Sequence, residues 1–110
     1  MRAWLILALV MSSPAHAGDE KDKARLLLRQ FGCGSCHRIP EVADAVGDVG
    51  PSLEKFGARS YIAGILPNNT DNLVRFIRDP RSVDSRTAMP NLGVGEAHAR
   101  AMAAYLRSLR

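Results

Sequence analysis

The sequence is poor in aromatic residues, with one Trp, two Tyr and three Phe among 110 residues. Trp4 lies in an apolar stretch at the start, so the chain beyond it has no Trp and only five aromatic side chains. Domains this small bury a modest share of their surface and are often stapled or filled by something besides protein. The thin aromatic core therefore favours a large apolar cofactor at the centre of the domain.

A long apolar run is also missing. Residues 3–11 (AWLILALVM) reach about half of the roughly 20 residues that a membrane-spanning helix needs. The run follows Arg2 and precedes Ala-His-Ala at 15–17, which is the order of a secretory signal peptide with an A-x-A cleavage site. We predict that residues 1–17 are a cleaved signal and that 18–110 form one periplasmic domain without a transmembrane segment. An uncleaved membrane anchor is the alternative.

Dense charge of one sign is absent as well. Lys and Arg number 15 against 11 Asp and Glu, a net charge of +4, which falls to +3 when Arg2 leaves with the signal. No Lys/Arg run marks a nucleic-acid interface, so no nucleic-acid partner is expected. A mildly basic surface can still steer a protein toward acidic partners.

Strand-like alternation is lacking, and the apolar residues instead follow a helical period. Three segments have this period: 19–31, 68–80 and 96–109. A shorter helix is expected at 61–65, and Gly- and Pro-rich loops cover 38–58 and 80–95. Long loops are uncommon in so small a domain unless something such as a central ligand organises them. The predicted fold class is all-α, with three main helices, short helical turns and long loops around one bound group.

Cysteine is limited to two residues, both in the motif Cys33-Gly-Ser-Cys36-His37. C-x-x-C-H is the signature of c-type haem attachment. The two intervening residues let both thiols reach the vinyl groups of one porphyrin edge, and the next residue then lies over the iron. His37 is therefore the predicted proximal ligand.

Three other interpretations of the cysteine pair stay open. A dithiol oxidoreductase also uses C-x-x-C, typically at a helix start after a strand, whereas this pair follows a predicted helix. A zinc site needs four ligands, and His98 is the one His or Cys that the mature chain offers besides the motif. A structural disulfide suits an exported protein but leaves His37 and the long loops unexplained.

The sixth ligand of the iron has three candidates in the mature chain. Met102 lies on the apolar stripe of the last helix, where a Met is usually a core residue. His98 lies early on that helix and off the stripe. Met89 lies in a polar loop beside Pro90, and ligands often lie on loops held by a rigid scaffold, so Met89 is the predicted ligand. A His/Met pair raises the haem potential and suits one-electron transfer.

Together these features resemble a class I cytochrome c over essentially all of residues 18–110. The stretch 57–95 is also similar to the cytochrome c domain fused to subunit II of some haem–copper oxidases. Gly-Pro-Ser-Leu at 50–53 resembles the Gly-Pro segment of that family. The resemblance implies that the Pro51 carbonyl accepts a hydrogen bond from the His37 imidazole. It also implies that two side chains bond a haem propionate: Arg59 and Tyr61.

The expected protein is a soluble, monomeric electron carrier rather than an enzyme. Its cofactor would be one haem c per chain, held by Cys33 and Cys36 through two thioethers, with His37 and Met89 as metal ligands. Its partners would be a redox donor and a redox acceptor, such as a terminal oxidase. Two alternatives are a haem c subunit docked permanently on a respiratory complex and a haem enzyme or gas sensor with an open sixth position.

Overall fold

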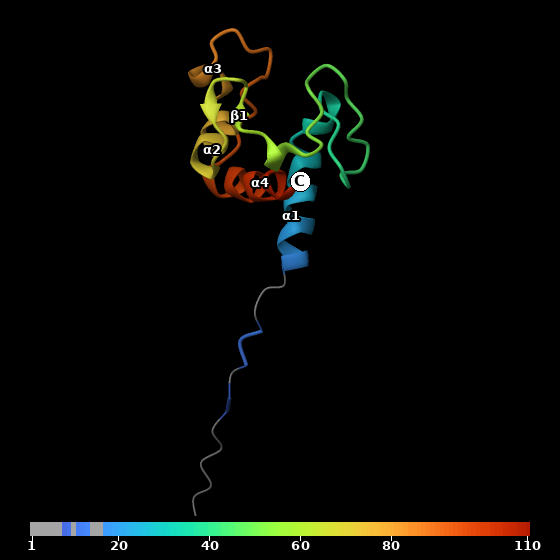
Figure 1. The fold of residues 1–110 in the computed structure, drawn as a ribbon. Coiled ribbons are helices and arrows are strands. Elements are labelled where there is room, and N and C mark those ends of the chain that lie inside the picture. The colour runs from blue at the N-terminus through green and yellow to red at the C-terminus, as the bar shows by residue number, and fades with distance from the viewer. Residues whose placement is uncertain (1–7, 10, 14–16) are drawn as a thin grey trace, which may run out of the picture.

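The computed structural model describes residues 8–9, 11–13 and 17–110 (Figure 1). Most of the predicted signal peptide lies outside the described residues. Four α-helices follow one another along the chain: α1 (Ala17–Gln30), α2 (Thr70–Arg78), α3 (Pro80–Val83) and α4 (Glu96–Ser108). Two short 3-10 helices and two short strands complete the fold: η1 (Cys33–Ser35), η2 (Phe56–Ala58), β1 (Tyr61–Ile62) and β2 (Leu66–Pro67). None of the described helices has the length and apolarity required to cross a membrane.

The core lies where α1 and α2 pack against α4 (Figure 1). Small side chains on both helices let α1 approach α4 closely, because Ala24 is 2 % exposed and Ala103 is fully buried. Met102 is fully buried in the same layer. α1, α2 and α4 coincide with the three segments of helical periodicity, since each helix buries one apolar face.

The predicted fold class, an all-α cytochrome c fold with three main helices, is wrong. The described residues form four α-helices and a small two-stranded antiparallel sheet. The additional helix, α3, begins at Pro80, where the predicted helical segment 68–80 ends and a loop was expected. Proline suits the first helical position because the N–H that it lacks would have no partner there. The same residue thus follows one helix and starts the next.

The sheet replaces the short helix that was expected at 61–65. Its strands pair Tyr61 with Pro67 and Ile62 with Leu66. The turn between them has two residues in the left-handed region, Ala63 at φ 52° and Gly64 at φ 68°. A helix cannot continue through such a turn, so the chain reverses direction and returns toward α2.

Candidate cofactor and metal site

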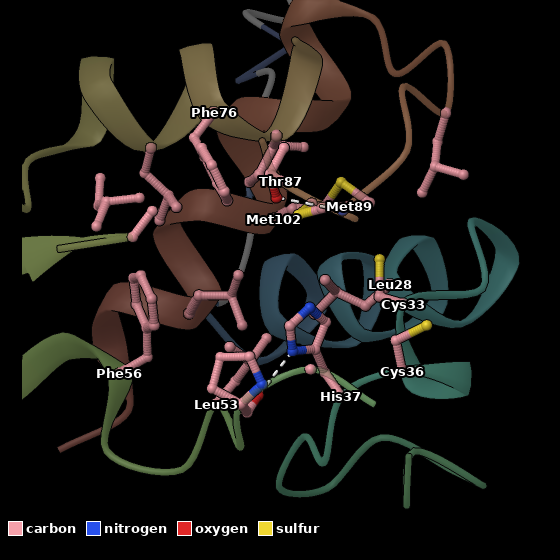
Figure 2. A pocket seen from close by; sticks show the side chains of 18 of the residues that line it. Leu28, Cys33, Cys36, His37, Leu53, Phe56, Phe76, Thr87, Met89 and Met102 are labelled. Carbon is pink, nitrogen blue, oxygen red and sulfur yellow. Dashed lines mark hydrogen bonds between the residues drawn. The ribbon is translucent and has the colours of Figure 1, made fainter. Parts of the chain in front are cut away.

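A cavity of about 420 Å³ lies between the cysteine motif and the loop that precedes α4 (Figure 2). Its walls are mainly apolar side chains from α1, α2, α4 and the long loops, including Leu28, Leu53, Phe56, Phe76, Met102 and Leu106. Small-molecule and cofactor sites have this size and apolar character, with a few polar groups that orient the ligand.

His37 is one of those polar groups, and its ring is held from two directions. Its Nδ1 lies 2.7 Å from the Pro51 carbonyl oxygen. Because a carbonyl only accepts, Nδ1 carries the hydrogen and Nε2 keeps a free lone pair. The backbone of Gly50 packs on the ring, since a Cβ at that position would lie 2.5 Å from Cε1 of His37. The imidazole is therefore fixed with Nε2 available as a metal ligand.

Main-chain hydrogen bonds attach the 45–53 loop to the cysteine motif. Gly47 N donates to the Gly34 carbonyl at 3.0 Å, and Gly50 N donates to the Cys36 carbonyl at 2.7 Å. Any Cβ on Gly47 would come within 2.6 Å of the Cys36 backbone, so only glycine permits this approach. The 45–53 loop thus holds the backbone that leads into His37.

Cys33 and Cys36 both line the cavity and are free cysteines, so the structural disulfide considered above is not formed. Burial raises the pKa of the Cys33 thiol. A desolvated thiol of this kind stays protonated near neutral pH, which disfavours the reactive thiolate of a dithiol oxidoreductase.

Met89 enters the cavity from the wall opposite His37 (Figure 2). Its backbone N–H donates to Thr87 Oγ1 at 3.2 Å, which fixes the turn that aims the side chain inward. The other ligand candidates differ: Met102 is fully buried at the cavity wall, and His98 is exposed on α4 with its ring 6.3 Å from that of Phe31. The cavity therefore has a nitrogen donor and a thioether donor facing each other.

Arg59 lines the cavity as well, whereas Tyr61 does not. The Arg59 guanidinium donates to the Ser52 carbonyl and lies 5.4 Å from the centre of the Phe56 ring. Tyr61 lies in β1 with 58 % of its surface exposed. Of the seven site residues expected from the sequence, six line the cavity: Cys33, Cys36, His37, Pro51, Arg59 and Met89.

Sequence reasoning missed Gly50 and Thr87, the two residues that position the predicted ligands His37 and Met89. Each is close in sequence to a residue that was found, because Gly50 precedes Pro51 and Thr87 precedes Met89 by two positions. A search for hydroxyl residues beside Met89 would have found Thr87, whereas Gly50 is 13 residues from His37 in sequence and carries no such signal. The apolar walls were missed because they come from separate helices.

The donor set suits a metal that is already held by an organic cofactor. Within the described part of the chain, no group of three or more His, Cys, Asp or Glu side chains could hold a metal ion. A bare ion would therefore find too few ligands, since zinc takes four and hard cations take six or more. A large apolar cavity with one donor on each side instead fits a cofactor that supplies the remaining ligands itself.

No family model matches the chain. Its sequence is 37 % identical over 90 residues to cytochrome c oxidase subunit 2 of Alkalihalophilus pseudofirmus. The aligned region covers 81 % of this chain and 25 % of that protein. The subunit 2 of Bacillus sp. strain PS3 is 35 % identical over 82 residues, 71 % of this chain and 23 % of that protein. The subunit 2 of Bacillus subtilis is 28 % identical over 105 residues, 90 % of this chain and 27 % of that protein.

These relatives correct two predictions. The first is the cofactor: we expected one haem c per chain, bound through two thioethers. The relatives are named as oxidase subunits 2, which does not support this cofactor, so the assignment is withdrawn. The prediction of a protein that is not an enzyme is also corrected, because the relatives are subunits of an oxidase. The predicted link to an oxidase subunit is confirmed. The chain spans about a quarter of the length of its curated relatives and is similar to that part of cytochrome c oxidase subunit 2.

Proposed function

We propose that this chain is an electron-transfer domain docked on a respiratory oxidase. The observation that carries the proposal is the similarity to oxidase subunit 2 over most of the chain. It favours a docked subunit over the freely diffusing carrier expected from the sequence. The apolar cavity with opposed His and Met donors gives such a domain a place for a redox group.

We assign His37 Nε2 and Met89 Sδ as the ligands of a transition metal in the cavity. The cofactor, when bound, would supply reversible one-electron chemistry. Cys33 and Cys36 would line its edge nearest the motif, and the Pro51 carbonyl would keep the His37 ring in its tautomer and orientation. A thioether opposite an imidazole favours the reduced metal more than a second nitrogen would.

The surrounding residues would keep the site apolar and rigid. Phe56 and Leu53 are buried at the cavity wall, where they would exclude water from the metal. Low local polarity disfavours added charge on the metal and so contributes to its potential. Ligands held in fixed positions need little rearrangement between oxidation states. Arg59, which lines the cavity, would bond an acidic group at the edge of the cofactor, whereas Tyr61 lies outside the lining and is given no such role.

Metal analysis and spectroscopy of the purified full chain test the ligand assignment. Elemental analysis gives the metal per chain and distinguishes iron from copper, and absorption spectra follow oxidation and reduction. His37→Ala and Met89→Ala are each expected to change the spectrum and the potential. His98→Ala, an exposed His, and Met102→Leu, a buried Met, are the matched controls. A redox spectrum that persists unchanged in His37→Ala and Met89→Ala would refute the assignment.

Docking is tested by purification from the native host. A tagged full chain should be recovered with terminal oxidase subunits after gentle solubilisation of the membranes, in stoichiometric amount. Recovery as a free monomer with a redox spectrum would support the soluble carrier and the narrower resemblance to class I cytochromes c instead. A chain with an open metal position that binds carbon monoxide in the native state would favour a gas sensor.

Export to the periplasm remains a proposal that rests on the N-terminal pattern. If residues 1–17 are a cleaved signal, mass spectrometry of the protein isolated from its host should give the mass of a chain that begins at Gly18. A retained N-terminus in the mature protein would contradict the proposal.

A further inference from the structure

The C-terminal end of α4 packs tightly against η2. Gly57 N–H donates to the Leu109 carbonyl at 2.7 Å. A Cβ on Gly57 would lie only 2.0 Å from the carbonyl oxygen of Arg107, so the two backbones touch. The contact surface between η2 and the end of α4, which we call the η2–α4 joint, has no room for a larger residue.

Asn68 enters the same joint from the segment before α2. Its Nδ2 donates to two carbonyl oxygens of the η2 region, Phe56 O at 3.1 Å and Arg59 O at 3.0 Å. The Arg107 side chain extends toward this segment, because its Nη1 donates to Thr70 Oγ1 at 2.8 Å. Thr70 lies two residues after Asn68, so the Arg107 side chain reaches the same short segment that carries the Asn68 amide.

Two buried polar atoms in the joint have no hydrogen-bond partner among the described residues, namely Oδ1 of Asn68 and Nε of Arg107. Such groups in native proteins are almost always paired with protein or with ordered water. The two atoms are complementary, since Oδ1 only accepts and Nε–H only donates. Turning the Asn68 amide over gives no remedy, because Oδ1 would then face two carbonyl oxygens.

We propose that one water molecule is bound in the η2–α4 joint, accepting from Arg107 Nε–H and donating to Asn68 Oδ1. A buried water needs at least two polar partners, and these two atoms supply one of each kind. Bridging water of this type is nearly as favourable in enthalpy as a direct hydrogen bond. The water ties the end of α4 to the segment before α2. Neither Asn68 nor Arg107 lines the cofactor cavity, so this site is separate from it.

A crystal structure of the full chain, at a resolution that shows ordered water, tests the proposal directly. A density peak within hydrogen-bond distance of both Arg107 Nε and Asn68 Oδ1 is expected. A direct hydrogen bond between these two atoms would overturn the proposal, and so would a joint without such a peak.

Arg107→Lys gives a second test, because lysine keeps the positive charge but lacks the Nε–H group. Arg100→Lys is the matched control, since Arg100 lies on the same helix and its ion pairs are exposed. Arg107→Lys also loses the Nη1 hydrogen bond to Thr70, so Thr70→Ala, which removes that acceptor alone, is a second control. The Tm of Arg107→Lys should fall by about 4–8 °C more than that of either control, as expected for the further loss of the Nε–H group in a domain of this size. A Tm equal to that of either control would overturn the proposal. If Arg107→Lys does not fold, the wild-type crystals decide.

Discussion

Replacing Gly50 by alanine should weaken cofactor binding by displacing the His37 ring. The added Cβ would lie 2.5 Å from Cε1, 2.8 Å from Nδ1 and 3.1 Å from Nε2 of the imidazole. Ordinary contact begins at 3.4 Å, so the ring or the Gly50 backbone must move by about 1 Å, a displacement that rigid functional sites tolerate poorly. The shift acts on a ring whose Nδ1 is hydrogen-bonded at 2.7 Å to the very next residue, Pro51.

The magnitude follows from the two interactions that are disturbed. Overpacking costs about 1–3 kcal/mol of folding stability. Loss of a partner that orients a ligating His typically costs about 10–100-fold in metal affinity. We therefore expect a protein that still folds, is less stable by that amount, and retains the metal-bearing cofactor 10–100-fold less tightly.

Two measurements separate these effects. Urea unfolding of the cofactor-free chain gives the cost to the fold, and competition for the cofactor gives the change in affinity. Gly95→Ala is the control, because nothing lies within 4 Å of its Cβ position, and its cost should stay within about 1 kcal/mol. If Gly50→Ala binds the cofactor as tightly as wild type, then contact with Gly50 does not position His37, and the reasoning fails.

Three further predictions concern stability and are measured by urea or thermal unfolding. Tyr105→Phe should cost about 1 kcal/mol, because the hydroxyl donates to the Pro40 carbonyl at 2.7 Å; an unchanged midpoint would contradict this role. Burial raises the pKa of Tyr105, so its contribution is complete below the unfolded pKa of about 10 and is lost as pH rises through the higher folded pKa; the wild type should therefore lose stability above pH 10 more steeply than Tyr105→Phe. Asn69→Ala should cost about 1 kcal/mol, because the Asn69 side chain caps α2 by accepting from Asn72 N at 2.9 Å; Asn91→Ala, which removes a similar contact from an exposed loop, should cost less.

The long helices could be predicted because their apolar faces repeat over several turns. Leu73 and Ile77, for example, are one turn apart on α2 and both are buried against the core. The two strands could not be predicted, since each has two residues and alternation needs more than that to be visible. α3 spans four residues and starts at Pro80, a residue that equally well ends a helix.

The site was predictable where its residues are neighbours in sequence. Cys33, Cys36 and His37 form one motif, and their places in the cavity follow from η1 and the turn after it. Met89 could be selected because an apolar side chain in a polar loop needs a buried destination. The role of Gly50 could not be seen, because it depends on a distance between two segments. For the same reason the sequence did not indicate that Tyr61 lies outside the cavity lining.

The two proposed ligands, His37 and Met89, differ in how their segments are attached. Main-chain hydrogen bonds join the His37 segment to a second loop, including Leu53 N to the Arg38 carbonyl at 2.8 Å. The hydrogen bonds of the Met89 loop stay local, as from Arg86 N to Asp84 and from Gly93 N to Asn91. The Met89 loop is thus a replaceable unit. A protein engineer could exchange residues 84–95 as one cassette, with a different donor in place of Met89, and leave the half of the cavity that carries His37 intact.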